Sequence, residues 1–453
     1  MKRILVANRG EIACRILRTC KRLGLKTVAV HSEADAAAMH VSLADRAVAI
    51  GASPPAQSYL VGERIVAAAR SAGADAIHPG YGFLAENEDF ARLVSTSGLA
   101  WIGPDPKTIE DMGDKERARL LAKAAGLPVL PGSARFEPGQ LAGIDAAARD
   151  VGFPLLVKAS AGGGGIGMRQ VSRMEDLAQA VTTTQAMAAR AFGDGTVYLE
   201  RYIAEARHVE VQVFGFGDGR AIHLHERDCS IQRRFQKIVE ETPAPLLAPA
   251  TREAMCRDAV ALCEQERYRG AGTIEFVFDT QTQRYYFLEM NTRIQVEHPV
   301  TEMVTGLDLV ELQIRLAGGE PLPVRSQADV KASGHSIECR LYAERPAKGF
   351  LPSPGVLSRF EVPAGDPKVR IDTGVRSADR ITHFYDPMIA KLIVADADRD
   401  GAIDRMRATL AAVAVEGVET NLEFLRRVVA HPAFRAGEVG TGFVERHKAS
   451  LLG

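Results

Sequence analysis

The chain has 453 residues, of which 46% are apolar and 25% charged, and its 56 basic and 57 acidic side chains leave a net charge of −1. This balance excludes a globally basic nucleic-acid binder and a disordered acidic chain, and no apolar run approaches the ~18 residues that cross a bilayer. The length corresponds to about three domains. Asn8, Arg9 and Glu11 interrupt any signal-peptide core, and six cysteines without metal-binding spacing favour reduced thiols. We therefore expect a cytoplasmic protein with neither nucleic-acid nor membrane partners.

The first hundred residues alternate short apolar strands with amphipathic helices. We expect strands at Ile4–Ala7, Thr27–Val30, Val48–Ile50, Ala74–Ile77 and Ala100–Ile102, and helices at Glu11–Leu23, Tyr59–Ala72 and Asn87–Ser97. This order predicts a doubly wound parallel sheet with helices on both faces, whose loops at the carboxyl ends of the strands build sites. The first of these loops has a single glycine, Gly10, so a dinucleotide-binding fold is poorly supported.

A glycine-rich loop follows a short apolar strand in the second hundred residues. The strand Leu155–Val157 ends at Lys158, and a further strand is expected at Met168–Val171. The loop between them includes Gly163, Gly164 and Gly165. Glycines let backbone amides surround an anion, and the lysine adds a positive charge for phosphate. Because the Gly-Lys-Ser/Thr ending of a P-loop is missing, we predict a hairpin flap over phosphates, with a disordered linker as the alternative.

Strand patterns dominate between about residues 209 and 300. Within this stretch, the segment Glu226–Lys237 is charge-dense, and Lys237 could bind an anion as a point charge. A solvated surface loop is the alternative interpretation. His208 opens one of the strands, where a structural hydrogen-bonding role is more frequent than a catalytic one.

Two alternating strands near residue 280 carry acidic side chains. Glu275 lies on the strand Thr273–Phe278 and Glu289 on the strand Arg284–Met290. Antiparallel pairing would set the two carboxylates opposite or diagonal to each other, where they repel. A cation between them reverses that repulsion, and Asn291 adds an amide oxygen suited to Mg²⁺ or Mn²⁺. A solvated strand face is the alternative.

The alternation is expected to continue beyond the second strand as far as Glu297. It would place Arg293, Gln295 and Glu297 on the same ribbon face as Glu289. A metal next to a fixed guanidinium and a free carboxylate suits the handling of a small oxyanion beside a phosphoryl group.

Together these residues resemble the biotin carboxylases, the ATP-grasp subunits or domains of biotin-dependent carboxylases. The similarity covers nearly the whole chain in order, and Glu289–Pro299 is its most specific part. The other matching stretches include Asn8–Ala13, His78–Phe83, Glu226–Lys237, Gly349–Gly355 and Tyr385–Lys391. The resemblance implies a Rossmann-like pre-ATP-grasp domain at residues 1–112, an ATP-grasp domain at 113–330 with a mobile lid at about 131–203, and a mixed α/β C-terminal domain at 331–447.

The resemblance also implies a ligase reaction. ATP phosphorylates bicarbonate to carboxyphosphate, which decomposes to CO₂ and phosphate. The phosphate takes the proton from biotin N1′, and the resulting ureido anion attacks CO₂ to give carboxybiotin. Carboxyphosphate is labile, so water must be excluded while it forms, and a glycine-hinged lid over ATP can do this. The implied cofactors are ATP, Mg²⁺ or Mn²⁺, and biotin on a carrier protein.

Position by position, the resemblance assigns residues to each ligand. The ATP site would contain Lys115, Lys158, Gly163, Gly164, Gly165, Glu200, Ile203, His208, Gln232, Glu275 and Glu289. The metal would bind Glu275, Glu289 and Asn291, bicarbonate would bind Lys237, Arg293, Gln295 and the Val296 backbone, and biotin would meet Tyr81 and Arg340. The catalytic residues would be Glu297 as the base for bicarbonate, Arg340 as the stabiliser of the biotin enolate, Arg293 and Lys237. Phe235 stands where the family often carries a histidine that meets the nucleotide, so that contact stays open.

No Ala-Met-Lys-Met biotinylation motif occurs. We therefore expect biotin to arrive on a separate carrier protein or domain, with a carboxyltransferase subunit as a further partner and a homodimer as the assembly. The final acceptor stays open among acetyl-CoA, propionyl-CoA, 3-methylcrotonyl-CoA, urea and 2-oxo acids. One alternative is another ATP-grasp ligase, such as a carbamoyl-phosphate or purine-pathway enzyme, which would lack the Glu289–Pro299 pattern and Arg340. The other is a non-catalytic ATP-binding regulatory subunit, which should have lost a metal ligand or Glu297.

Overall fold

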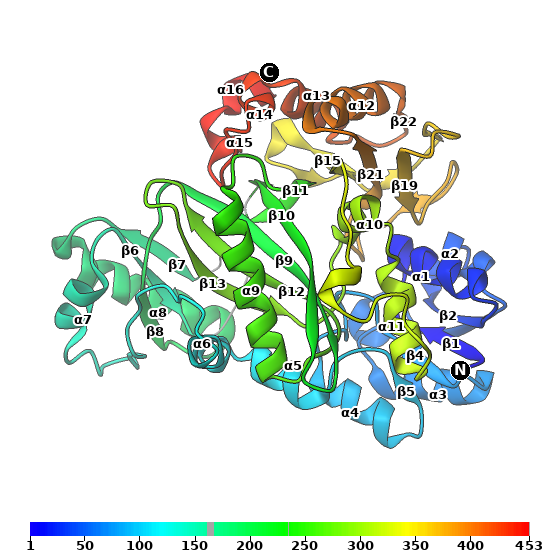
Figure 1. The fold of residues 1–453 in the computed structure, drawn as a ribbon, viewed down its shortest axis with the longest axis horizontal. Coiled ribbons are helices and arrows are strands. Elements are labelled where there is room, and N and C mark those ends of the chain that lie inside the picture. Colours follow the sequence, from blue (N-terminus) through cyan, green and yellow to red (C-terminus); the bar gives the residue numbers. More distant parts are fainter. Residues whose placement is uncertain (161–166, 234, 453) are drawn as a thin grey trace.

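The computed structural model describes residues 1–160, 167–233 and 235–452. Figure 1 shows an N-terminal α/β unit, a small helix-covered sheet at the opposite end of the long axis, and a large sheet that runs between them toward the C-terminal helices. The expected mixed α/β architecture is confirmed. None of the helices in the described ranges is both long enough and apolar enough to span a membrane.

The N-terminal sheet has the strand order β3-β2-β1-β4-β5, and all its pairings are parallel. Its strands are β1 Arg3–Val6, β2 Lys26–Ser32, β3 Arg46–Gly51, β4 Ala76–His78 and β5 Ala100–Trp101, and its helices are α1 Gly10–Arg22, α2 Met39–Leu43, α3 Gly62–Ala72 and α4 Glu88–Thr96. The apolar strands lie in buried clusters against these helices. The loops after β1 and β4 leave the same edge of the sheet, where they place Glu11 and Tyr81 together.

The glycine-rich loop joins two strands of a small antiparallel sheet with the order β7-β6-β8. The strands are β6 Leu155–Ala159, β7 Met168–Val171 and β8 Val197–Arg201, and the helices of this region are α5 Pro106–Gly113, α6 Lys115–Ala124, α7 Ile144–Val151 and α8 Leu177–Phe192. The expected strand after the loop is confirmed, because β6 and β7 pair as the two arms of a hairpin. Gly163, Gly164 and Gly165 lie outside the described residues.

The large sheet has eight strands in the order β13-β12-β9-β10-β11-β14-β21-β19, all antiparallel. They are β9 Ala206–Phe216, β10 Ala221–Arg233, β11 Gln236–Thr242, β12 Arg269–Asp279, β13 Arg284–Asn291, β14 His335–Tyr342, β19 Val369–Thr373 and β21 Met388–Asp396. The helices are α9 Pro249–Gln265, α10 His298–Thr305, α11 Leu309–Ala317, α12 Arg399–Ala412 and α13 Leu422–Ala430. One continuous sheet therefore joins the middle of the chain to its C-terminal part.

Short elements complete the C-terminal part of the chain. They are β15 Glu344–Arg345, β16 Leu351–Pro352, β17 Gly355–Val356, β18 Arg359–Glu361, β20 Arg380–Ile381, β22 Ala414–Glu416, α14 Pro432–Arg435, α15 Phe443–Arg446 and α16 Lys448–Leu452. Helices α12 and α13 cover the apolar face of β14 and β21. Helix α10 packs against β10, β11, β14 and β21, where buried charged residues such as Glu338, Arg340 and Lys391 lie.

The C-terminal part meets the N-terminal unit through direct backbone contact at Gly374, just after β19. A Cβ atom at this position would lie 2.3 Å from the carbonyl carbon of Gly10 and 2.4 Å from the amide nitrogen of Glu11. Both neighbouring atoms belong to backbone at the start of α1, so neither can move independently of the helix.

We predict that Gly374→Ala lowers the free energy of unfolding by about 1–3 kcal/mol, because the methyl group forces the two backbones apart. Urea unfolding followed by circular dichroism measures this effect. Gly442→Ala is the matched control, since a Cβ atom there meets nothing within 4 Å. Equal effects of the two substitutions would contradict the contact.

Candidate active site

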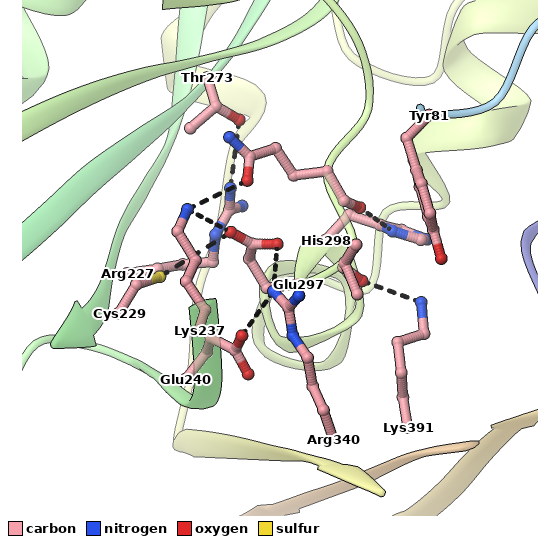
Figure 2. Close-up of polar contacts among 12 residues, drawn as sticks. Tyr81, Arg227, Cys229, Lys237, Glu240, Thr273, Glu297, His298, Arg340 and Lys391 are labelled. Atoms are coloured by element: carbon pink, nitrogen blue, oxygen red, sulfur yellow. Dashed lines mark hydrogen bonds and ion pairs between the residues drawn. The ribbon is translucent and has the colours of Figure 1, made fainter. Parts of the chain in front are cut away.

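The ammonium group of Lys237, on β11, contacts three carboxylates of a buried acidic cluster, and Figure 2 shows its contact with Glu297. Its Nζ donates to Glu210 Oε2 at 2.5 Å, Glu275 Oε1 at 2.8 Å, Glu297 Oε1 at 2.6 Å and Gln295 Oε1 at 3.2 Å. Burial alone would lower the pKa of Lys237, but the surrounding carboxylates raise it well above its ordinary value. Lys237 therefore stays charged at physiological pH.

Strand register places three of the carboxylates in a row. Glu210 on β9 pairs with Glu275 on β12, and Glu275 pairs with Glu289 on β13. Burial alone would raise the pKa of Glu275, but Lys237 and His208 overcome this and hold its pKa well below the usual range. At Glu289, burial and the charge of Glu275 raise the pKa. The negative charge of the row is therefore balanced by cations near Lys237, whereas at Glu289 it is not balanced in this way.

The oxygen donors at the Glu289 end of the row suit a hard divalent cation. Glu275 and Glu289 lie directly opposite each other, as the alternation predicts. The amide of Asn291 already makes two contacts, since its Nδ2 donates to Glu275 Oε1 and its Oδ1 accepts from Arg293, both at 3.0 Å. Among the described residues, ligand atoms of His208, Glu210 and Glu275 lie within 4.8 Å of one another, and Glu289 is not in that group.

The residues expected to contact the nucleotide form two groups. On the small sheet, Lys158 Nζ lies 2.6 Å from Glu200 Oε1, and Ile203 is half-buried just after β8. On the large sheet, His208 Nδ1 lies 2.9 Å from Gln232 Nε2. A separate cavity of about 220 Å³ is lined by Lys115, Glu289 and Asn291, and none of the residues named in the two groups lines it.

Arg340 joins the acidic cluster to a further buried carboxylate. Its Nη2 lies 2.6 Å from Glu240 Oε1 and 2.9 Å from Glu297 Oε2, while its buried Nε has no hydrogen-bond partner among the described residues. Lys237 and Arg340 hold the pKa of Glu297 below its usual range despite complete burial. Tyr81, the other residue expected near biotin, donates its hydroxyl to Glu11.

The expected continuation of the strand beyond Asn291 is wrong. Strand β13 ends at Asn291, a loop follows, and α10 begins at His298 with Pro299 in its first turn. Proline suits that position because its ring presets the helical φ angle and the missing N–H is not needed there. Arg293 bonds Glu86 at 2.7 Å, whereas Gln295 and Glu297 both reach Lys237. The loop therefore gathers side chains that a straight strand would spread apart.

Several buried residues of the site were not predicted from the sequence. They include Glu11, Glu210, Arg227, Glu240 and Lys391. The exposed Glu86, whose carboxylate accepts from the Thr292 N–H, was not predicted either. The alternation that starts at His208 could have identified Glu210, since both side chains lie on one face of β9. Arg227 donates to Glu210 Oε1 and Gln212 Oε1, each at 2.6 Å, and also contacts Thr273 and Thr301.

Comparisons with known proteins agree with this geometry. Models of the biotin carboxylase N-terminal and C-terminal domains match residues 1–109 and 338–446, and a model of the carbamoyl-phosphate synthase L chain ATP-binding domain matches residues 114–325. Biotin carboxylase 1 of Bacillus subtilis is 48% identical, with 99% of each chain covered. The chain belongs to the biotin carboxylase family. The expected enzyme class of this family, a ligase that carboxylates biotin, is confirmed with it.

Other relatives of this biotin carboxylase chain are larger proteins or solved domains. The alpha subunit of methylcrotonoyl-CoA carboxylase from Arabidopsis thaliana is 49% identical over the whole chain, which spans 61% of that subunit. The biotin carboxylase domain dimer of Hydrogenobacter thermophilus 2-oxoglutarate carboxylase, solved with MgADP, ADP and bicarbonate, has a TM-score of 0.93 at 47% identity, with 99% and 98% of the two chains covered. The Campylobacter jejuni biotin carboxylase in its β,γ-ATP complex has a TM-score of 0.92 at 44% identity, with 98% and 99% covered.

We predict that Arg227→Met destabilises the fold by about 3–5 kcal/mol, because it leaves the Glu210 carboxylate buried with less compensation. Chemical unfolding measures the loss. The matched control is Arg220→Met, which removes a guanidinium from an exposed pair with Asp218 and should change stability little. A small effect at Arg227 would show that the buried network tolerates an unpaired charge.

Proposed function

We propose that this site carboxylates biotin in two stages, with ATP and bicarbonate as co-substrates. The observation that carries the proposal is the position of Glu297, a fully buried carboxylate between the cations of Lys237 and Arg340. Two cations around one carboxylate, next to a row of acidic residues, suit an anionic substrate that must lose a proton beside a metal-bound nucleotide.

ATP lies between the small sheet and the large one. Lys115 and Lys158 bind its phosphates, with Gly163, Gly164 and Gly165 closing over them. Glu200 and Ile203 meet the adenine, and His208 and Gln232 extend the nucleotide site. Glu275, Glu289 and Asn291 hold Mg²⁺ or Mn²⁺, and this cation supplies charge neutralisation for the transferring phosphoryl group. Burial and the charge of Glu275 raise the pKa of Glu289, and a bound cation would favour its ionised form, which supports this role.

Bicarbonate binds beside the nucleotide, among Lys237, Arg293, Gln295 and the Val296 backbone. Glu297 accepts its proton. Before binding, Lys237 and Arg340 keep Glu297 ionised and therefore able to act as a base. Bicarbonate then brings its own negative charge to Lys237 and Arg293, which weakens their stabilisation of the Glu297 carboxylate and favours proton transfer to it. The deprotonated substrate attacks the γ-phosphorus of ATP, giving carboxyphosphate and ADP.

Biotin enters next to Tyr81 and Arg340. Carboxyphosphate breaks down to CO₂ and phosphate, the phosphate removes the N1′ proton, and the ureido anion attacks CO₂. Arg340 stabilises the enolate oxygen of that anion, and its buried Nε, which has no hydrogen-bond partner in the described part of the chain, provides a donor for it. An arginine suits this task because it remains charged and presents several donors in one plane.

Two other functions are less well supported. Another ATP-grasp ligase would not need Arg340 beside Glu297, yet these two side chains are 2.9 Å apart. A regulatory ATP-binding subunit would not keep a complete set of metal and base residues, and Glu275, Glu289, Asn291 and Glu297 are all present.

The same relatives support proposals about the partners of the enzyme, its carboxyl acceptor, its domain boundaries and its location. We assign biotin to a separate carrier protein or domain, with a carboxyltransferase as the consumer of carboxybiotin and a homodimer as the assembly, a state that the Hydrogenobacter domain adopts. The acceptor stays open, since relatives include methylcrotonoyl-CoA, pyruvate, 2-oxoglutarate and urea carboxylases. We propose the division at residues 112 and 330, which the limits of the three family matches support, and a lid at about residues 131–203. All six cysteines are free and buried, which supports a reducing, cytoplasmic location.

The function is tested by ATP hydrolysis with and without bicarbonate and free biotin. We expect bicarbonate-dependent turnover that biotin stimulates and that yields carboxybiotin. Glu297→Gln should reduce this turnover at least about 100-fold, since it removes the base, while nucleotide affinity measured by calorimetry stays within about twofold.

Glu445→Gln, on the exposed surface of α15, serves as the control and should behave as the unmodified protein. Turnover without biotin stimulation would favour the other ATP-grasp ligases. Unchanged turnover in Glu297→Gln would remove this residue from its role.

Arg340→Ala should reduce biotin carboxylation at least about tenfold more than bicarbonate-dependent ATP cleavage, because the enolate forms only in the second stage. Carboxybiotin formation and phosphate release are measured on the same sample. Arg359→Ala, in an exposed pair with Glu361, is the control. Equal losses in both activities would argue against the enolate role.

A further inference from the structure

Two buried side chains hold the loop between β13 and α10 from one side. His298 Nδ1 lies 2.7 Å from the Gln295 carbonyl oxygen, and Lys391 Nζ donates to the Val296 carbonyl oxygen at 2.8 Å. His298 and Lys391 are both 0% exposed. Two successive carbonyl groups of this loop are therefore each anchored by one side chain, and Figure 2 shows the contact of Lys391.

These anchors also set the direction of the next amides in the loop. The cis peptide bonds recorded for the described residues precede Pro154 and Pro243, so both bonds of Val296 are trans. In a planar trans peptide, the carbonyl and the following N–H point in opposite directions. The Val296 N–H thus points away from His298, and the Glu297 N–H points away from Lys391. Neither amide donates to an acceptor among the described residues.

We propose that His298 and Lys391 are positioning residues that aim the amides of Val296 and Glu297 at bicarbonate. The proposal rests on the function proposed above, in which bicarbonate meets the Val296 backbone. Two adjacent free amides form a concavity that binds anions, and they need no charge to do so. In Figure 2, Lys237 lies on the far side of Glu297 from Lys391, so charged and backbone donors approach from different directions.

The chemistry of the histidine suits a neutral anchor. Burial, with the nearby cations of Lys391, Arg15 and Arg370, lowers the pKa of His298 well below its ordinary value. The neutral ring carries one proton, and since a carbonyl only accepts, that proton lies on Nδ1. The buried Nε2 has no hydrogen-bond partner among the described residues, and Glu302 Oε2 lies 3.8 Å from it, beyond hydrogen-bond distance.

The lysine links the loop to the other parts of the chain. Its position on β21 pairs with Arg340 on β14, and its ammonium lies 3.2 Å from Glu11 Oε1 and 3.8 Å from Asp372 Oδ2. Glu11 also accepts the hydroxyl of Tyr81. A single ammonium thus fixes the bicarbonate loop against the carboxylate that holds the expected biotin-site tyrosine.

The test compares His298→Phe with His298→Asn in the full chain. Phenylalanine keeps a ring of similar size without a donor, whereas asparagine keeps a donor near the position of Nδ1. We expect the KM for bicarbonate to rise about 3- to 10-fold in His298→Phe, the loss of about one net hydrogen bond, with partial recovery in His298→Asn. The affinity for Mg-nucleotide should stay within about twofold of the unmodified protein.

The matched control is His40→Phe. His40 is also fully buried, and its ring nitrogen lies 3.2 Å from the Val30 carbonyl oxygen, in the N-terminal unit. This substitution removes the same kind of contact and should lower the thermal midpoint without changing the KM for bicarbonate. A rise in that KM for His40→Phe equal to that for His298→Phe would show a general effect of lost stability and would overturn the proposal.

Lys391→Met provides the second measurement, because both anchors act on one loop. The double variant with His298→Phe should raise the KM for bicarbonate less than the product of the two single effects. An unchanged KM in His298→Phe, with only kcat or the thermal midpoint reduced, would make the two residues merely structural. If the unmodified chain itself shows no bicarbonate dependence, the proposed function fails, which is a separate result.

Discussion

The site depends on charged side chains that are removed from water and must therefore compensate one another. Transfer of an ammonium or a carboxylate to a protein interior costs several kcal/mol per ion unless close counter-charges and hydrogen bonds replace water. Lys237 meets this requirement with three carboxylates at 2.5–2.8 Å. Those carboxylates come from β9, β12 and the loop before α10, so the cation determines how these elements lie relative to one another.

The same requirement extends across the molecule. Glu297 is shared between Lys237 and Arg340, and Arg340 also meets Glu240. Lys391 lies next to Arg340 on the neighbouring strand and contacts Glu11 in the first turn of α1. The charged layer under α10 is thus continuous from the N-terminal unit to the C-terminal strands, and none of these parts could complete the site alone.

Local patterns were sufficient to predict much of the fold. The period of two placed Glu275 opposite Glu289, because the two strands are adjacent and joined by a turn. The alternation of strands and helices likewise predicted the N-terminal sheet. Helix α9 was missed because it interrupts a region rich in strands. The alternation was extended to Glu297, although β13 ends at Asn291 and α10 begins at His298.

The contacts of Lys237 could not be predicted from spacing. They depend on the neighbours of β9, which pairs with β10 on one side and with β12 on the other, and strand order in a sheet is a non-local property. The same holds for Lys391, which reaches Glu11 from the far end of the chain. The family resemblance assigned Lys237 to bicarbonate, because this residue lies in a matching motif. It assigned no role to Lys391.

The charge distribution along the row of Glu210, Glu275 and Glu289 also favours different ligands at its two ends. At the Lys237 end, nearby cations keep Glu275 and Glu297 ionised, and the same cations can contact an added anion. At the Glu289 end the pKa is raised, so an added cation is favoured instead. In the proposed function, a metal-bound nucleotide would therefore bind at one end of this short row and a small oxyanion at the other, so that the two ligands are neighbours. Because these charges are fixed by the sheet before any substrate arrives, the protein would not need to reorganise them during the reaction.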